Sequence, residues 1–439
     1  MSEANSAVYS DANVTPPMSQ AVPLGLQHVL AMFASNVTPS IIVAGAAGLA
    51  FGGAEQVYLI QMAMLFAGVA TIFQTIGLGP IGAKLPIMQG TSFAFVGVLA
   101  GIAATQGLGV ALTSCVIAGV VHFAFGSVIS KIRSWFPPLV TGLVILAIGL
   151  YLIPVGIKYA AGGAADFQMA ADSFGSLQHW SVALTVIVVA VLVKFKTNNT
   201  LANASILIGL VAGYILAYML GMVSFSGVAK ATWITGLQVM PFGFEFSLGA
   251  VIGVVLISIV SAVETVGDVS ATTKAGAGRE ATDAEIAGAT YADGLGTAVA
   301  GVFGGLPNTS FSQNVGIISM TGVMSRHVVT IAGVIMFLCG LIPKVGATIA
   351  SMPFPVLGGG VIVMFGMVAS AGLNVLSDVK MNRRNMVIIA ISLTVGLGLN
   401  LVPSAVQYLP GVWKTLATSA VAPTAFLAII LNKVLPEDA

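Results

Sequence analysis

Charged residues are scarce in this chain. Only 7% of its 439 residues are Asp, Glu, Lys or Arg, whereas 57% are hydrophobic. Soluble domains carry about 25% charged residues, so the composition excludes a water-soluble globular fold and indicates an integral membrane protein. The formal net charge of +1 points to no charged partner, and no basic patch favours nucleic-acid binding.

Cysteine, histidine and catalytic motifs are also sparse. Cys115 and Cys339 occupy separate apolar segments and are expected to be small buried hydrophobes without a disulfide. The four histidines are scattered, and neither a His-Glu-x-x-His motif nor a Gly-x-Ser-x-Gly elbow occurs. We therefore expect no enzyme activity, no metal site and no cofactor. Residues 1–22 start without a basic, apolar leader and predict a disordered cytoplasmic tail.

Long apolar segments recur along the rest of the chain, and they number fourteen. With the N-terminus inside, twelve Lys and Arg residues fall in cytoplasmic loops and four on the other side, as the positive-inside rule requires. This distribution predicts a multi-pass protein of the inner (plasma) membrane with both termini in the cytoplasm. The segments are 23–43, 56–78, 85–105, 108–130, 137–157, 180–195, 204–222, 248–273, 284–304, 308–322, 327–349, 354–376, 384–402 and 411–434.

The two halves of the chain resemble each other. Leu-Pro followed by a Thr-Ser-Phe group occurs at residues 85–93 and again at 306–311, with the threonines 218 residues apart. A Pro- and Gly-containing apolar run at 138–145 matches residues 355–362 at an offset of 217. Two matches at nearly one offset predict a seven-plus-seven duplication, whose second copy is inverted in the membrane.

The stretch from Leu306 to Arg326 is too polar and too interrupted to be an ordinary spanning helix. It predicts a short extended piece followed by a short helix, the pattern of a transporter binding site. If half-helices start near Ser92 and Ser312, their free N–H groups and positive dipole ends face each other at the membrane midplane. Such an arrangement favours a polar or anionic ligand.

Three carboxylates lie inside predicted spans and not among the first or last few residues of a span. Ionisable groups at such positions usually mark function. Glu264 and Asp268 are one helical turn apart, so they share a helix face. Two poorly hydrated carboxylates cannot both ionise cheaply, which suits a carrier that picks up a proton. Alternatively, Asp268 lies near the cytoplasmic end and is hydrated. Asp293 either supports a broken segment or joins the proton path.

Several other polar or aromatic residues are candidates for the site. His28 lies in the first predicted span, where a structural hydrogen bond is the favoured role. Adjacent amides at Gln313 and Asn314 suit a flat heterocycle with alternating C=O and N–H edges. Phe93 is placed to stack on the ring of such a ligand.

Residues 313–322, Gln-Asn-Val-Gly-Ile-Ile-Ser-Met-Thr-Gly, resemble the signature of the nucleobase–ascorbate transporters, the nucleobase:cation symporters of the xanthine/uracil permease type. That signature is Gln, Glu or Pro, then Asn-x-Gly, four variable residues, Thr, and Arg, Lys or Gly. All defined positions match. The resemblance extends through His28 and residues 89–93, 264–268 and 292–294, and it covers nearly the whole chain beyond the tail.

The resemblance implies an all-α polytopic membrane protein with fourteen transmembrane segments in two inverted seven-segment repeats. Short strands are expected in the broken segments 3 and 10. Residues 23–136 and 248–352 would form a core domain, and residues 137–222 and 353–435 a gate domain. We expect the core to rock against the gate, with residues 358–360 allowing close helix approach at the boundary, and the protein to form a homodimer through the gate domain.

The resemblance also implies function: proton-coupled import of a purine base, xanthine or uric acid. Glu264 would bind the base with Gln313 across the ring, helped by backbone near Phe93 and Ser312. Asn314, Asp293, Asp268 and His28 would support the site or the proton. Gln313 resembles the purine members, whereas uracil members have Glu there and His in place of Asp268. Ser92 is also expected among the base-binding residues. Related xanthine permeases have Asn there, and the smaller hydroxyl is expected to enlarge the site and shift the preference toward uric acid, so xanthine and uric acid both stay open.

Two alternatives remain for the sequence alone. One is a uracil permease of the same family. The other is an anion transporter on the same inverted-repeat scaffold, since a fold does not fix function; such a site is expected to have a basic residue near its half-helices.

Overall fold

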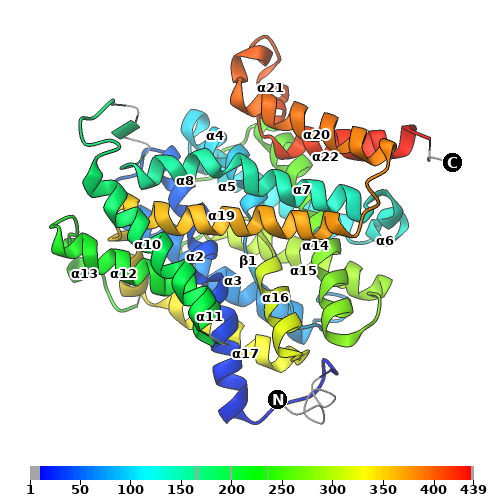
Figure 1. The fold of residues 1–439 in the computed structure, drawn as a ribbon, viewed down its shortest axis with the longest axis horizontal. Coiled ribbons are helices and arrows are strands. Elements are labelled where there is room, and N and C mark those ends of the chain that lie inside the picture. The colour runs from blue at the N-terminus through cyan, green and yellow to red at the C-terminus, as the bar shows by residue number, and fades with distance from the viewer. Residues whose placement is uncertain (1–9, 164–165, 168, 198–199, 235, 437–439) are drawn as a thin grey trace.

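The computed structural model describes residues 10–163, 166–167, 169–197, 200–234 and 236–436. Apart from two strands of three residues, its elements are helices (Figure 1). The first half of the chain forms α2 (Met18–Ala46), α3 (Ala54–Ile76), β1 (Gln89–Thr91), η1 (Phe93–Phe95), α4 (Val96–Gln106), α5 (Leu108–Phe125), α6 (Ile129–Ile132), η2 (Arg133–Trp135), α7 (Pro138–Tyr151), α8 (Ile153–Ala160), α10 (Leu177–Lys196), α11 (Thr200–Asn203), α12 (Ser205–Met219) and α13 (Ser226–Lys230).

The second half repeats this alternation of long, short and broken helices. Its elements are α14 (Leu248–Ala277), α15 (Asp283–Val302), β2 (Asn308–Ser310), α16 (Ser312–Thr321), α17 (Arg326–Leu341), α18 (Pro343–Ala350), α19 (Phe354–Ser377), α20 (Arg383–Leu401), η3 (Pro403–Val406), α21 (Gly411–Ala417) and α22 (Val421–Val434).

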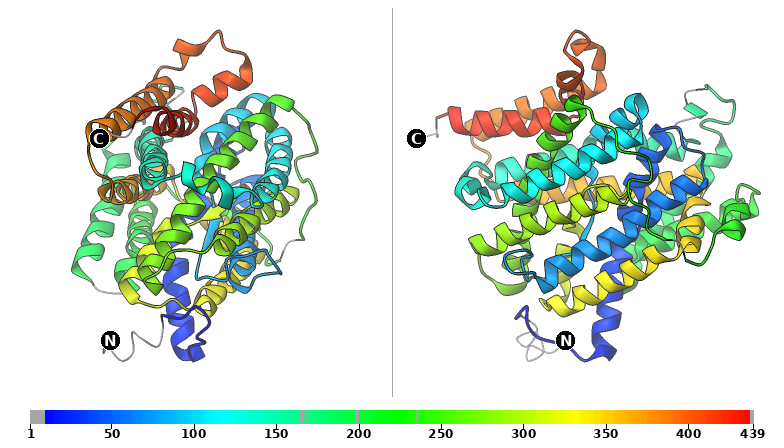
Figure 2. Two further views of the ribbon diagram at one scale, coloured as in Figure 1. Left: turned by 90° about the vertical axis from the view of Figure 1, so that its right-hand side faces the viewer. Right: turned by 180° about the vertical axis from the view of Figure 1, so that it is seen from behind.

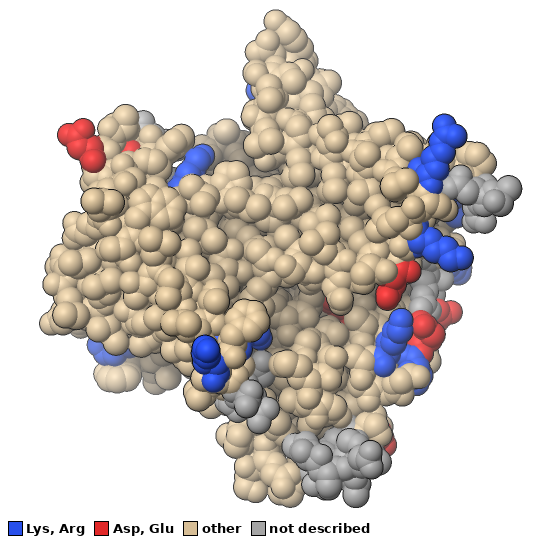
Figure 3. Space-filling model, in the orientation of Figure 1, with Lys and Arg blue, Asp and Glu red and all other residues tan. Residues whose placement is uncertain are grey.

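Eight helices of the described chain are long and apolar enough to cross a membrane, or nine if the bent pair α17 and α18 counts as one span. The bend between these two helices is 81° and falls where Pro343 follows α17. Each of the fourteen segments predicted from hydropathy overlaps a helix. The segments that do not form one of these long apolar helices are short, broken or polar. The broad middle of the visible surface carries almost no charged side chains, as contact with lipid requires (Figure 3).

The strands β1 and β2 bring the two halves of the chain together in the middle of the molecule. They pair antiparallel with Gly90 opposite Thr309, and all six strand residues are buried. The ladder is extended by Ser92 N–H, which donates to Pro307 O at 2.8 Å. A Cβ on Gly90 would lie 2.5–2.8 Å from the side chains of Phe311, Met32 and Asn36, so this crossing requires glycine.

The long helices pack in pairs that join distant parts of the sequence. α3 lies against α17, α5 against α15 and α7 against α19, while α10 packs on α12 and α20 on α22 (Figures 1 and 2). Small residues allow the close crossings: a Cβ on Gly68 of α3 would overlap the backbone of α17, and one on Gly119 of α5 would overlap that of α15. The C-terminal helices, orange and red in Figure 2, lie away from the N-terminal end of α2.

The glycine triplet at 358–360 has a different role from the one expected. In α19, Gly358 faces Ala160 of α8, Gly359 faces Ala183 of α10, and Gly360 faces Leu210 of α12. These partners all belong to the segment predicted as gate. The triplet therefore allows close packing inside that segment and does not lie at a boundary with the core.

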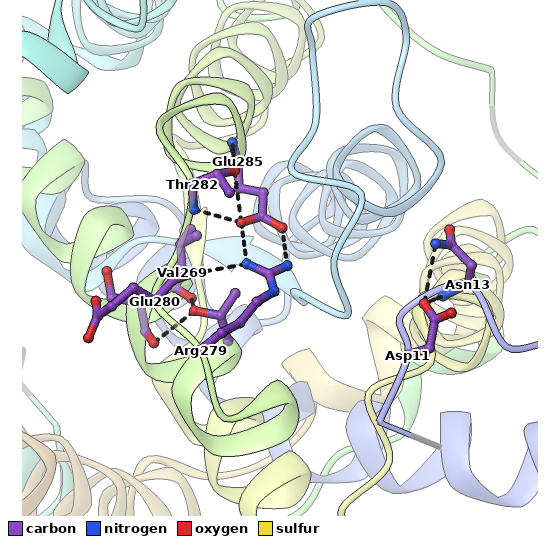
Figure 4. Close-up of polar contacts among 9 residues, drawn as sticks. Asp11, Asn13, Val269, Arg279, Glu280, Thr282 and Glu285 are labelled. Carbon is purple, nitrogen blue, oxygen red and sulfur yellow. Dashed lines mark hydrogen bonds and ion pairs between the residues drawn. The ribbon is translucent and has the colours of Figure 1, made fainter. Parts of the chain in front are cut away.

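The N-terminal tail was predicted to be disordered over residues 1–22, and residues 10–22 differ from that prediction, whereas residues 1–9 lie outside the described residues. α2 already begins at Met18, and the preceding described residues are held by hydrogen bonds. Ala12 O accepts from Arg326 N–H at 2.9 Å, and Val14 O accepts from the Ser325 hydroxyl at 2.5 Å. Asp11 accepts from the Asn13 backbone N–H in a local turn (Figure 4). The described part of the tail thus covers the start of α17.

The turn between α14 and α15 is fixed by one ion pair and a capping box (Figure 4). Arg279 donates to both carboxylate oxygens of Glu285, at 2.9 and 2.5 Å. Partial burial acts against ionisation of Glu285, but the hydrogen bonds from Arg279 and Thr282 hold its pKa below the ordinary value. This turn anchors the end of α14, the helix that carries Glu264 and Asp268.

Candidate functional site

A cavity of about 500 Å³, which we call the central cavity, lies where the strands and half-helices meet. One wall comes from α14, the strands and α16, and the other from α7 and α19 together with α10 and α12. Residues that line it include Thr91, Phe93, Ile145, Ile148, Glu264, Thr309, Ser310, Ser312, Gln313, Gly316, Met367 and Ala371. The mixed lining, mostly apolar with a few polar groups, is typical of a small-molecule site.

Glu264 is the carboxylate that faces this cavity. It is half-buried on α14, and its Oε2 atom is buried without a hydrogen-bond partner among the described residues. A buried carboxylate oxygen without a partner is costly. Glu264 is therefore available to hold a proton or to accept hydrogen bonds from a ligand.

Asp268 lies one turn further along α14 and is held on both sides. Its Oδ2 accepts from the Ser310 hydroxyl at 2.7 Å, and its Oδ1 accepts from the Ser312 hydroxyl at 2.6 Å. Its exposed fraction is 4%, so it is not freely hydrated. Asp268 ties α14 to the end of β2 and the start of α16.

Asp293 of α15 plays the same part for the other strand. Gln89 Nε2 donates to its Oδ1 at 2.6 Å, and the Thr265 hydroxyl donates to its Oδ2. The side chain is fully buried and is not among the residues that line the central cavity. Of the two roles open for Asp293, these contacts favour support of the broken segment.

His28 and Asn314 join the first helix to the half-helix α16. Asn314 Nδ2 lies 3.0 Å from His28 Nδ1 and donates to His28 O at 3.1 Å. Both residues are buried, and neither is among the cavity-lining residues. They position α16, whereas the neighbouring Gln313 faces the cavity.

The remaining predicted site residues also divide into those that line the central cavity and those that do not. Gln313, Ser312 and Phe93 line the cavity, and the Phe93 ring packs edge-on against Phe365 of α19 at 5.2 Å. Ser92 does not line it: its hydroxyl accepts from Ala94 N–H at 3.3 Å and caps η1. A small hydroxyl at residue 92 therefore does not enlarge the site directly.

The sequence analysis missed two residues that shape the site. Asn36 of α2 accepts from Thr91 N–H at 2.8 Å and donates to Ala63 O at 3.0 Å, which fixes β1 against α2 and α3. Tyr151, at the end of α7, donates to Phe93 O at 2.9 Å. The available signal was a polar side chain inside a long apolar run, the same signal that marked His28.

A second cavity of about 870 Å³, the vestibule, continues from the central cavity toward the surface. Its walls include Thr141, Asp268, Lys274, Asn374 and Asp378, and Lys274 Nζ lies 3.8 Å from Asp378 Oδ2. The residues that line both cavities are Ile145, Ser312, Gly316, Ser319 and Ala371. The binding region thus opens on the side of Lys274. The described chain contains no cluster of three His, Cys, Asp or Glu residues suited to a metal ion.

The chain matches the family described as "Permease family" over residues 19–405. A xanthine permease of Bacillus subtilis is 34% identical over 412 residues, which cover 93% of this chain and 92% of the relative. The uric acid permease PucK of Bacillus subtilis is 35% identical over 415 residues, covering 94% and 95%. The xanthine permease XanP of Escherichia coli is 33% identical over 444 residues, covering 96% and 93%.

Solved structures with the same fold are more distant in sequence. The transmembrane domain of the cyanobacterial bicarbonate transporter BicA superimposes with a TM-score of 0.62 at 15% identity, covering 95% of this chain and 98% of that domain. SLC26A9 superimposes with a TM-score of 0.61 at 12% identity, covering 95% and 66%. At this identity the likeness concerns the fold alone.

Proposed function

The chain belongs to the xanthine/uracil permease family and is a multi-pass membrane permease, and on this premise we propose that it imports a purine base, xanthine or uric acid, together with a proton. The observation that carries the proposal is that Glu264 and Gln313 face one cavity from two different helices. A carboxylate and an amide there match the alternating N–H and C=O edges of an oxidised purine.

The choice of a purine rests on Gln313 and on the relatives. Gln313 stands where uracil members of the family carry Glu, and the similar proteins include permeases named for xanthine and for uric acid. Phe93 lines the same cavity and offers a ring face or edge to a flat ligand. Because Ser92 faces its own helix, discrimination between xanthine and uric acid falls to other lining residues.

The proposal of proton coupling is supported by the contacts of three carboxylates, the buried Asp268 and Asp293 and the half-buried Glu264. Asp268 and Asp293 each have both oxygens occupied by side-chain donors, whereas Glu264 has a buried oxygen without a partner in the described chain. Moving an ionised, unpaired Glu264 through an apolar barrier is costly. A proton on Glu264 neutralises the side chain while the site crosses the barrier. Loss of that proton to water then leaves Glu264 ionised again.

The helix pairs support two inverted seven-segment repeats. If α3 corresponds to α15 and α5 to α17, the pair α3–α17 is the counterpart of the pair α15–α5. The same correspondence relates β1 to β2, α7 to α19, and the pair α10–α12 to the pair α20–α22. An inverted repeat is a common basis for alternating access.

We propose the same division into domains that the sequence predicted. We assign residues 23–136 and 248–352 to the core and residues 137–222 and 353–435 to the gate, with the central cavity between them. With the basic loops inside, both termini are cytoplasmic and the vestibule opens to the cytoplasm. A homodimer would form through the gate domain.

A bicarbonate transporter with the same fold makes an anion carrier the second candidate. The acidic Glu264 beside the half-helices counts against an anion as ligand, but the basic Lys194 of α10 lines the same cavity. Proteoliposomes separate the two: the purine proposal expects saturable xanthine or urate uptake that the other base inhibits. Saturable chloride or sulfate current that neither base inhibits would favour the anion carrier.

A further inference from the structure

On the side of the central cavity opposite Lys274, one hydroxyl joins the predicted gate to the predicted core. Tyr151 ends α7, whose other end, Pro138, lines the vestibule. Its Oη donates to Phe93 O at 2.9 Å and accepts from Gly97 N–H at 3.3 Å. Tyr151 is 7% exposed and Phe93 is 7% exposed, so both bonds are shielded from water.

These two bonds fall on the backbone where the broken segment becomes a helix. Gly97 lies in the first turn of α4, where N–H groups need partners from outside the helix, and a gate side chain supplies the oxygen. A Cβ on Gly97 would lie 3.3 Å from the Tyr151 ring, so glycine leaves room for the ring. The start of α4 is therefore completed by a residue from the other domain.

A second contact acts on the same residue. Phe365 of α19 is buried and packs edge-on against the Phe93 ring with an interplanar angle of 87°. Thus α7 and α19 both hold Phe93 on this side. On the other side, the central cavity continues into the vestibule between α14 and the same two helices.

We propose that Tyr151 is a latch that closes the non-cytoplasmic side of the binding site by holding the backbone of Phe93 and Gly97. Opening that side separates α7 from α4 and breaks both hydrogen bonds. Tyr151 acts through the Phe93–Gly97 backbone and is a positioning residue for the transport cycle. The proposal rests on the alternating access proposed above.

The test measures which side of the membrane the site faces. A parent without Cys115 and Cys339, each replaced by Ala, carries Ala371→Cys as reporter, because Ala371 lines both cavities. A membrane-impermeant maleimide is added to right-side-out and to inside-out vesicles. The ratio of the two labelling rates, outer over inner, reports the ratio of outward-open to inward-open carriers.

Tyr151→Phe keeps the ring and removes only the hydroxyl. We expect it to raise the labelling ratio about five- to thirty-fold, the range for loss of one or two net hydrogen bonds. Tyr159→Phe is the matched control: Tyr159 is also buried in the predicted gate, but its hydroxyl makes no hydrogen bond among the described residues. The control should leave the ratio unchanged.

An unchanged ratio in Tyr151→Phe would overturn the latch, as would equal shifts in both variants. Labelling from one face only, in parent and variant alike, would also overturn it, because a latch that never opens controls nothing. The readout needs no substrate. Failure of purine uptake with a shifted ratio would therefore count against the proposed substrate and leave the latch standing.

Discussion

Glu264 and Asp268 lie one turn apart on α14, yet side-chain hydroxyls hold only Asp268. Ser310 and Ser312 occupy both oxygens of Asp268, while Oε2 of Glu264 is buried without a partner among the described groups. Two carboxylates on one helix face thus have different tasks. Asp268 orders the half-helix, and Glu264 is the carboxylate that we propose for the proton and the ligand.

The first prediction concerns Glu264. Glu264→Gln keeps the size and removes the ionisable group, so uptake against a gradient should stop while the protein still reaches the membrane. Glu245→Gln, at an exposed acid before α14, is the control and should transport normally. Accumulation of labelled substrate in intact cells is the measurement. Normal accumulation by Glu264→Gln would contradict a role of Glu264 in proton coupling.

The second prediction concerns Asp268. In Asp268→Asn one carboxylate oxygen becomes an NH2 group, so one serine hydroxyl has to accept instead of donate. Both bonds to a carboxylate also become weaker bonds to an amide, at a cost of about 1–3 kcal/mol. We expect a lower thermal-unfolding midpoint in detergent and a higher KM, because α16 loses its anchor. Asp378→Asn, at the exposed mouth of the vestibule, should change neither. A normal midpoint and KM in Asp268→Asn would show that the Ser310 and Ser312 contacts do not position α16.

The third prediction concerns rocking between the domains. Lys274 of α14 and Asp378, which follows α19, approach to 3.8 Å across the vestibule. In the background without native cysteines, Lys274→Cys with Asp378→Cys joined by a bis-maleimide should stop uptake, because core and gate can no longer move apart. Ligand binding in detergent should persist, as should uptake by each single-cysteine variant after the same treatment. Uptake by the fully cross-linked protein would contradict relative motion at this point.

The fourth prediction is a pH dependence at the α14–α15 turn. Since the pKa of Glu285 is lowered in the folded state, its contribution to stability is present above the ordinary Glu pKa, about 4.3, and is lost as the pH falls through the lower folded value. Glu285→Gln should therefore lower the thermal midpoint near neutral pH and differ little from the parent in acid. Glu245→Gln is the control. A difference of equal size at both pH values would assign the effect to packing instead of charge.

The broken segments were predictable because their polar residues conflict with a membrane span. Asn308 to Thr321 forms the expected extended piece and short helix, and the repeat placed its partner at residues 89–93. The hydrogen-bond partners were not predictable. His28 contacts Asn314, which is 286 residues further along the chain, and Asp293 accepts from Gln89 at a separation of 204 residues. Such pairs depend on how whole helices pack.

Local chemistry explains the expectations that failed. The Ser92 hydroxyl accepts from the N–H two residues on, a competing local bond typical of serine at a helix start. The glycines at 358–360 indicated a close crossing, but the sequence does not say which helix crosses there. The tail is polar, yet its backbone carbonyls find donors at Ser325 and at the start of α17, where Arg326 N–H has no partner within its own helix.

The most direct test of the central claim is uptake of labelled xanthine, uric acid and uracil by cells that lack their own base carriers, with and without a protonophore. The proposal predicts saturable uptake of xanthine or uric acid that collapses when the protonophore is added. Uptake of uracil alone would show that Gln313 does not select purines, and uptake of a purine that the protonophore leaves unchanged would contradict proton coupling through Glu264.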